Sequence, residues 1–246
     1  MQKQSITPYI EVKGVSHRYN EVVVLDNVSC GIEKGSITAI IGPNGSGKTT
    51  LIRGILGLLS PTVGTITIEG KKPSEMRTHI GYVPQHLQFD RTLPITVNEF
   101  LKTYQCKDQK HRYKNIAQVL KEVGLKNQIN QKIGTLSGGQ FQRALIARAI
   151  FHEKDILVLD EPSAGIDIEG EHSLYELIER LHDEHGTTCI IISHDVAIVH
   201  RFADSVICLN KKKICQGTPS STITPEVLKQ LYGTDAGVYQ HTHNHS

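Results

Sequence analysis

The chain has 246 residues, of which 38% are hydrophobic and 21% are charged, and this composition supports a packed core and argues against a disordered chain. Its 27 lysines and arginines nearly balance 25 aspartates and glutamates, and the resulting formal charge of +2 argues against a nucleic-acid partner. No apolar run approaches the ~20 residues of a membrane-spanning helix, and the N-terminus lacks the apolar stretch of a signal peptide, so we expect a cytosolic protein.

The first part of the chain predicts the order strand, glycine loop, helix. Apolar and β-branched residues at 22–28 and 36–41 predict two strands, the second of which ends at Gly42. Apolar residues at helical spacing predict a helix over 49–59, and alternation predicts a strand over 65–69. This order is the one that a phosphate-binding loop requires.

The character of the chain changes between about residues 93 and 151, where polar loops join segments with helical periodicity. Helices are expected there over 98–104, 113–123 and 139–151. Strands and helices then alternate again, over 156–160, 169–185, 188–193, 196–202 and 205–209. Gly186 is expected to end the helix over 169–185. The pattern predicts an α/β fold with a mainly parallel sheet covered on both faces and interrupted by a helical insertion of about 60 residues.

The cysteines are odd in number and form no C-x-x-C pair, which indicates reduced, mostly buried thiols rather than a disulfide scaffold. They are Cys30, Cys106, Cys189, Cys208 and Cys215.

A glycine-rich segment matches the pattern G-x-x-x-x-G-K-[ST] at every fixed position. It consists of Gly42, Pro43, Asn44, Gly45, Ser46, Gly47, Lys48 and Thr49, with Thr50 next in the chain. Glycines let backbone N–H groups face a phosphate, and the helix that follows adds its positive N-terminal end. Lys48 would supply a cation for the β- and γ-phosphates, and the Thr49 hydroxyl a ligand for Mg²⁺.

Two carboxylates follow a buried strand about 110 residues further on. Asp160 and Glu161 come at the end of the strand over 156–160, at the sheet edge that the phosphate loop also faces. Asp160 would hold Mg²⁺, directly or through water, and Glu161 would polarise the attacking water as general base.

Two further polar residues are expected at this sheet edge. Gln85 follows a strand-like segment over 80–83, and His194 follows the strand over 188–193. Each alone is more typical of a structural polar residue than of a catalytic one, and their joint placement at strand ends favours a role in the reaction.

The segment Leu136-Ser137-Gly138-Gly139-Gln140 resembles the signature motif of the ATPase subunits of ABC transporters. The motifs of that family occur in the family's order over about residues 9–217: the phosphate loop, Gln85, the signature, Asp160, Glu161, the loop 163–167 and His194. The resemblance implies a P-loop NTPase (RecA-like) core with a mainly parallel sheet, an antiparallel β portion and an inserted helical subdomain. It divides one ATPase domain, 1–246, into a core (9–90 and 156–217), a helical signature subdomain (91–155) and a C-terminal extension (218–246).

The resemblance also implies a head-to-tail homodimer, with each ATP between the phosphate loop of one subunit and the signature loop of the other. Ser137 and Gly139, with their neighbours Gly138 and Gln140, would then bind the ATP held by the opposite subunit. Tyr19 matches the aromatic residue that stacks on adenine, a contact worth about 1–3 kcal/mol per base.

The remaining roles come from the same resemblance. Gln85 would sense Mg²⁺ and the attacking water and relay to a membrane partner, His194 would contact the γ-phosphate, and Asp167 would lie in the loop that crosses to the other subunit. The partners implied are integral membrane permease subunits and, indirectly, an extracytoplasmic metal-binding protein. The subunit would lie peripherally on the cytoplasmic face of the inner membrane.

The segments 81–97 and 209–219 resemble the ATPases of bacterial metal-uptake transporters, and the second of them, together with 237–239, resembles the zinc-uptake members. The chain ends in alternating histidines, His241, His243 and His245, which in an extended segment lie on one side. Imidazoles bind Zn²⁺, so a weak zinc sensor and a solvated tail both remain open. Leu87, Phe89 and Leu93 are expected to contact the permease.

Three alternatives remain open. The subunit could serve import of manganese or an iron chelate, be a soluble ABC ATPase outside transport, or be a metal-binding module without turnover. Leu136 lies 94 positions after Gly42, and the segment between them has no sustained heptads. This argues against the ABC ATPases of DNA repair, which carry long coiled coils between these two motifs. Intact Lys48, Glu161 and His194 argue against a module without turnover.

Overall fold

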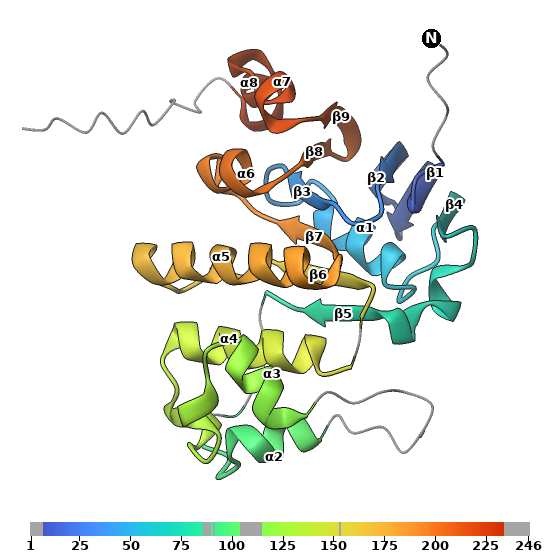
Figure 1. Cartoon of the computed structure of the whole chain (residues 1–246). Coiled ribbons are helices and arrows are strands. Elements are labelled where there is room, and N and C mark those ends of the chain that lie inside the picture. Colours follow the sequence, from blue (N-terminus) through green and yellow to red (C-terminus); the bar gives the residue numbers. More distant parts are fainter. Residues whose placement is uncertain (1–6, 86–89, 91, 104–114, 153, 234–246) are drawn as a thin grey trace, which may run out of the picture.

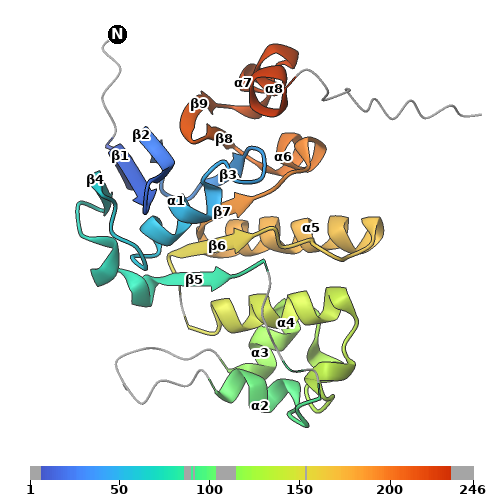
Figure 2. The same ribbon diagram turned by 180° about the vertical axis from the view of Figure 1, so that it is seen from behind.

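The computed structural model describes residues 7–85, 90, 92–103, 115–152 and 154–233, and its centre is a six-stranded sheet (Figures 1 and 2). In spatial order its strands are β5 (Ile80–Val83), β6 (Ile156–Asp160), β7 (Thr188–Ile192), β3 (Ile37–Ile41), β8 (Ser205–Asn210) and β9 (Lys212–Gly217). Every neighbouring pair is parallel except β8–β9. The expected α/β fold with a mainly parallel sheet is therefore confirmed.

One face of this sheet packs against helix α1 (Lys48–Ile55) and a second, antiparallel sheet. The second sheet has the order β2 (Val22–Ile32), β1 (Ile10–Tyr19) and β4 (Val63–Ile68). The shared core is aliphatic and includes Leu51 and Ile55 of α1 with Val158 and Ile190 of the large sheet. The expected antiparallel portion is therefore present, and it packs against helix α1.

Helices cover the opposite face of the sheet. They are α5 (Ile168–His185), α6 (Val196–Phe202), α7 (Pro219–Thr222) and α8 (Pro225–Tyr232). Strand residues point alternately to the two faces, so Ile191 packs with α5 while Ile190 packs toward α1. Gly186 ends α5 with φ of 63°, as its position predicted.

The helical portion lies beyond the β5 edge of the sheet (Figure 2). It contains α2 (Val97–Lys102), α3 (Ile116–Glu122) and α4 (Gly138–Ile150), with short 3₁₀ turns at Lys126–Gln128 and Ile133–Thr135. Further 3₁₀ turns, at Pro73–Glu75 and Arg77–His79, lie between β4 and β5. Its core is continuous with the sheet, because Val97, Leu120 and Leu145 belong to the same buried cluster as Leu157. Thr96 and Ser137 start α2 and α4 with capping boxes. Among the described residues, no helix has both the length and the apolarity to cross a bilayer.

Several element bounds differ from the sequence prediction. Helix α1 ends at Ile55 rather than at residue 59, because Gly57 takes φ of 65° and an added Cβ there would lie 2.6 Å from the backbone nitrogen of Ser74. Strand β9 and helices α7 and α8 had no predicted counterpart, and neither had β1.

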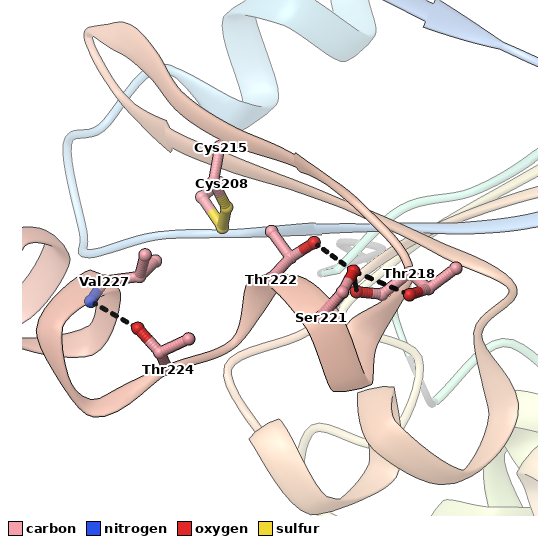
Figure 3. Close-up of a disulfide and its surroundings, with 7 residues drawn as sticks. All are labelled: Cys208, Cys215, Thr218, Ser221, Thr222, Thr224 and Val227. Atoms are coloured by element: carbon pink, nitrogen blue, oxygen red, sulfur yellow. Dashed lines mark hydrogen bonds between the residues drawn. A yellow bond between two sulfur atoms is a disulfide. The ribbon is translucent and has the colours of Figure 1, made fainter.

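The expected reduced state of all the cysteines is wrong for one pair. A disulfide joins Cys208 and Cys215, which face each other across the β8–β9 hairpin with Cα atoms 4.8 Å apart (Figure 3). The pairing depends on the register of a hairpin that the sequence did not reveal. Cys30 and Cys189 are buried free thiols, and Cys106 lies outside the described residues.

Candidate functional site

The site lies at the carboxyl edge of the parallel strands. There β3 leads into the glycine loop, β5 leads to Gln85, and β6 ends in Asp160. Parallel strands place their carboxyl ends on one side, so residues from three distant segments meet there. One cleft of about 190 Å³ contains many of the predicted residues: Asn44, Gly45, Ser46, Gly47, Lys48, Thr49, Thr50, Gln85 and Glu161, together with Val24.

The loop needs glycine at two positions for steric reasons. Gly42 has φ of 154°, and an added Cβ would lie 2.0 Å from the carbonyl oxygen of Leu209. Gly47 has φ of 98°, and its Cβ would lie 2.7 Å from Leu25 and from the carbonyl oxygen of Val24. The loop backbone is thus pressed against β2 and β8, which leaves its other side open to the cleft.

Lys48 holds its ammonium group at the mouth of the loop. Its Nζ donates to the carbonyl oxygens of Gly42, at 2.7 Å, and of Pro43, at 3.0 Å. Burial lowers the pKa of Lys48, and the carboxylates of Glu161 and Asp160 oppose this effect. The cation lies between the loop and the acidic strand end, where a polyphosphate could be bound from both sides.

The loop fits a phosphate group on two further observations. The Ser46 hydroxyl is buried and has no hydrogen-bond partner in the part of the chain that the structure describes. Helix α1 begins at Lys48, so its free N–H groups and positive end face the loop. A phosphate oxygen would satisfy such donors.

Gln85 and Glu161 are in direct contact across the cleft. Gln85 Nε2 donates to Glu161 Oε2 at 2.5 Å. Glu161 takes φ of 48°, and its N–H donates to the carbonyl oxygen of Ile192 at 3.1 Å. This left-handed turn directs the chain away from β6 as the strand ends, and the sequence prediction that both residues lie at one edge is confirmed by their contact.

Asp160 is buried and belongs to a charged cluster. Burial is the largest effect and raises its pKa, and Glu161 raises it further, while Lys48, the Tyr82 hydroxyl and Arg53 lower it. Tyr82 donates to Asp160 Oδ2 at 3.5 Å. A divalent cation here would stabilise the ionised carboxylate.

The donor set at this point also fits Mg²⁺. Thr49 offers a hydroxyl, Gln85 an amide oxygen and Asp160 a carboxylate, and hard oxygen ligands of this kind are the ones that Mg²⁺ prefers. Thr49 is exposed and lines the cleft.

His194 and Asp167 do not line the cleft. His194 follows the end of β7 and is exposed. Asp167 caps α5, because its Oδ1 accepts the N–H of Gly170 at 3.1 Å.

The signature residues are not brought to the cleft of their own chain. Ser137 caps α4, where its Oγ accepts the Gln140 N–H at 3.2 Å and its own N–H donates to Gln140 Oε1 at 3.1 Å. A Cβ added to Gly138 would lie 3.2 Å from the carbonyl oxygen of Gly165, and Gly139 lies near Ile166. The signature therefore packs beside the loop 163–167.

Two other predicted groups are also separate from the cleft. Tyr19 is 43% exposed at the end of β1, and its ring is nearly perpendicular to that of His17, with 4.8 Å between the centroids. The tail residues His241, His243 and His245 lie outside the described residues, as do Leu87 and Phe89.

Three residues near the site were not predicted from the sequence: Tyr82, Arg53 and Tyr232. Tyr82 and Arg53 lower the pKa of Asp160. Burial raises the pKa of Tyr232 in α8, and the backbone of Gly42 lowers it. Each reaches the site from an element whose position depends on tertiary packing. Tyr82 stands three residues before Gln85, and this proximity was the one available sequence signal.

The sequence of the chain is similar to known transporter subunits. The family model described as "ABC transporter" matches residues 25–164. A zinc import ATP-binding protein ZnuC of Pseudomonas fluorescens is 40% identical over 240 residues, which cover 96% of this chain and 88% of the relative. An ATP-binding protein of Thermotoga maritima, named for a metal transport system, is 41% identical over 94% of this chain and 92% of its own length.

Solved structures show the same architecture. CbiO1 of Clostridium perfringens, part of the ABC transporter complex CbiONQ, superimposes with a TM-score of 0.76 and 28% identity, covering 88% of this chain and 90% of that one. A dimeric bacterial ABC transporter cassette, MJ0796, superimposes with a TM-score of 0.74 and 26% identity, covering 85% and 98%. The fold is therefore that of ATP-binding cassettes.

Proposed function

The chain belongs to the ABC transporter family as an ATP-binding subunit of the metal-import type, and from this premise we propose that it hydrolyses ATP to drive uptake of zinc through a membrane permease. One observation supports the ATPase role most strongly: the phosphate loop, Gln85 and Glu161 line a single cleft, with Gln85 bonded to Glu161. ATPase subunits of importers in this family work as dimers with membrane permease subunits.

The residues of the cleft would have different roles in ATP hydrolysis. The loop amides, Ser46 and Lys48 bind the β- and γ-phosphates, while Thr49, Asp160 and Gln85 would hold Mg²⁺. When bound, Mg²⁺ neutralises charge on the transferring phosphoryl group. Glu161 accepts a proton from the attacking water, and Gln85 orients that carboxylate and the water.

The remaining roles require a second copy of the chain. Ser137, Gly138, Gly139 and Gln140 would close over the γ-phosphate held by the opposite subunit, and the N-terminal end of α4 suits an anion. Within each subunit, His194 contacts the γ-phosphate of the ATP bound by its own phosphate loop, and Tyr19 stacks on the adenine. The dimer is then held together by ATP and released by hydrolysis.

We assign the core role to residues 9–90 and 156–217, the signature role to 91–155 and an accessory role to 218–246. The permease would dock near the start of the helical portion, where Leu93 is 44% exposed. The subunit would work peripherally at the cytoplasmic face of the inner membrane, and an extracytoplasmic metal-binding protein would deliver the cargo to the permease.

Zinc as the cargo is supported by relatives named as zinc import proteins at about 40% identity. The chain does not itself contact the transported ion, so manganese or an iron chelate is the alternative cargo. Cells that lack the protein should fail to grow when zinc is depleted, and added zinc but not manganese should restore growth. Complementation with the Glu161→Gln variant should fail, whereas the parent chain should restore growth. Rescue by manganese alone would refute zinc as the cargo.

The histidines His241, His243 and His245 suggest a weak zinc sensor. Zinc binding there would lower ATP turnover once the cell holds enough metal. Deleting residues 240–246 should then abolish the response of the ATPase to added zinc while basal turnover stays constant. An unchanged zinc response in the deletion variant would assign the tail no sensing role.

A further inference from the structure

The disulfide between Cys208 and Cys215 closes the β8–β9 hairpin (Figure 3), and in the fold it lies close to the phosphate loop. Cys208 stands opposite Ile41 in the parallel ladder of β3 and β8, and Ile41 is the last residue before Gly42. The bond therefore fastens β9 to the strand that runs beside the start of the loop.

The turn of this hairpin contacts the loop through backbone hydrogen bonds. The Lys211 N–H donates to the Ser46 carbonyl oxygen at 2.8 Å, and the Lys211 carbonyl oxygen accepts the Asp26 N–H at 2.8 Å. Lys211 makes both contacts with φ of 58°, and Lys212 Nζ lies 3.2 Å from the Asp26 carboxylate. The position of the turn therefore bears directly on the backbone that would bind phosphate.

The disulfide lies where the pairing of the two strands is irregular. β9 is an edge strand of the six-stranded sheet, and the register of the β8–β9 ladder shifts between Cys208 and Leu209. Such a shift interrupts the regular ladder. The carbonyl oxygen of Leu209 lies against the loop, since an added Cβ on Gly42 would be 2.0 Å from it. The disulfide thus joins the strands at the point where the contacts with the loop begin.

Cys215 is the sulfur that a reductant can reach, because it is half-buried whereas Cys208 is fully buried. A thiolate of a dithiol would attack Cys215 Sγ, and the S–S bond would break with its electron pair going to Cys208 Sγ. The second thiol of the dithiol would then displace Cys215 from the mixed disulfide. The dithiol is thereby oxidised to a disulfide, and its two protons pass to the two cysteines. Oxidation by a small-molecule disulfide reverses these steps.

We propose that Cys208 and Cys215 form a redox-active pair that controls the affinity for ATP through the phosphate loop. In the oxidised state the bond holds the hairpin turn against Ser46, and reduction to two thiols releases this restraint and lowers the affinity. Persistent disulfides are rare in a reducing compartment, and those that occur there are usually catalytic or redox-sensing. The inference rests on the proposed function, because it assumes that ATP binds at the loop.

The test compares the oxidised parent chain with the same chain reduced by dithiothreitol. Reduction should weaken binding of a fluorescent ATP analogue about threefold to tenfold, the change expected for one net hydrogen bond. It should also lower the thermal midpoint by about 5–10 °C, because a cross-link that restrains the unfolded chain is lost. Alkylation of the denatured chain, followed by mass spectrometry, should count two more free thiols after reduction.

The Cys215→Ala variant cannot form the bond, so its affinity for the analogue should equal that of the reduced parent with and without dithiothreitol. The matched control is Cys30→Ala, which removes a buried thiol of β2 outside the disulfide and should respond to reduction as the parent does. Equal affinity of the oxidised and reduced parent, or no gain of thiols on reduction, would overturn the redox-active pair and leave the proposed function intact. A parent chain that binds no ATP in either state would instead refute the proposed function.

Discussion

Glu161 combines backbone strain with an engaged side chain. A left-handed backbone at a non-glycine residue costs about 1–2 kcal/mol, and such strain clusters at functional sites. Its carboxylate accepts a hydrogen bond from Gln85. In the proposed mechanism this contact would hold the general base in place.

Replacement of this carboxylate separates binding from turnover. Glu161→Gln should bind ATP as the parent does, because the phosphate loop is unchanged, and should lose about a hundredfold to ten-thousandfold in turnover, the usual contribution of a general base. Phosphate release and ATP binding, measured on the same sample, check this. Glu69→Gln is the matched control, since Glu69 also has a positive φ, 50°, but lies in an exposed turn away from the cleft. Parental turnover in Glu161→Gln would remove Glu161 from the reaction.

Lys48 is predicted to act mainly in binding. Lys48→Ala should weaken ATP binding about tenfold to a hundredfold, the loss expected for a charge-assisted hydrogen bond. Lys34→Ala is the control, because Lys34 pairs with Glu69 at 3.0 Å on an exposed surface. Titration of a fluorescent ATP analogue gives both affinities. Equal affinity of Lys48→Ala and the parent would contradict the assignment of the loop.

At the residue scale, sequence reasoning reached the groups that carry a fixed motif and missed those that do not. Gln85 and Glu161 were expected at one edge, and they are bonded there. Tyr232 gave no such signal, because a half-buried tyrosine is usual in a helix that packs on a core. Only the packing of α8 against the sheet brings its buried hydroxyl near the backbone of Gly42.

Two helices of the helical portion begin in the same way and are expected to differ in function. Thr96 and Glu99 form a capping box at α2, and Ser137 and Gln140 form one at α4. Thr96 is half-buried and Ser137 is exposed at the helix start, and only Ser137 is predicted to face ATP. Both caps are capping boxes, so comparing them separates the loss of a helix cap from the loss of a contact with ATP.

Removing either cap should lower stability by about 0.5–2 kcal/mol, the usual cost of a cap residue replaced by alanine. Thr96→Ala should retain parental ATP turnover per folded subunit. Ser137→Ala should lose turnover as well, because it also removes a donor to the γ-phosphate of the opposite subunit. Denaturant unfolding and steady-state phosphate release measure the two effects. Equal turnover of both variants would show that Ser137 acts only as a cap.

Elements with strong periodicity were predicted within a few residues, and those set by pairing were not. The helix at Val196–Phe202 has the predicted bounds, and β6 ends at Asp160 as expected. Strand β9 is basic at its start, and its partner β8 decides that it is a strand. The disulfide between Cys208 and Cys215 follows from that pairing, which explains why cysteine spacing alone did not reveal it.

At the scale of the whole molecule, the two halves of the proposed ATP site lie apart within one chain. The phosphate loop and Glu161 line the cleft, whereas Ser137 lies at the start of α4 in the helical portion, beside the loop 163–167. In the proposed site, a single subunit would therefore supply two separate parts: the acidic and phosphate-binding residues of its cleft, and the signature residues at the start of α4. Two copies in head-to-tail arrangement would complete both sites.

The fold class could be predicted because strand and helix alternation is local, but the dimer could not be deduced from geometry alone. The net charge of +2 does not by itself indicate a partner. The dimer arrangement came from the signature motif and its family resemblance. It therefore remains the prediction on which the other proposed roles depend.

The steady-state ATPase rate per subunit, measured with Mg²⁺ across a range of subunit concentrations, tests this prediction most directly. Because each site needs Ser137 from a second copy, the rate per subunit should rise with concentration and reach a plateau when dimers form. A rate per subunit that is constant from the most dilute sample upward, or no hydrolysis even with the permease present, would contradict the composite site.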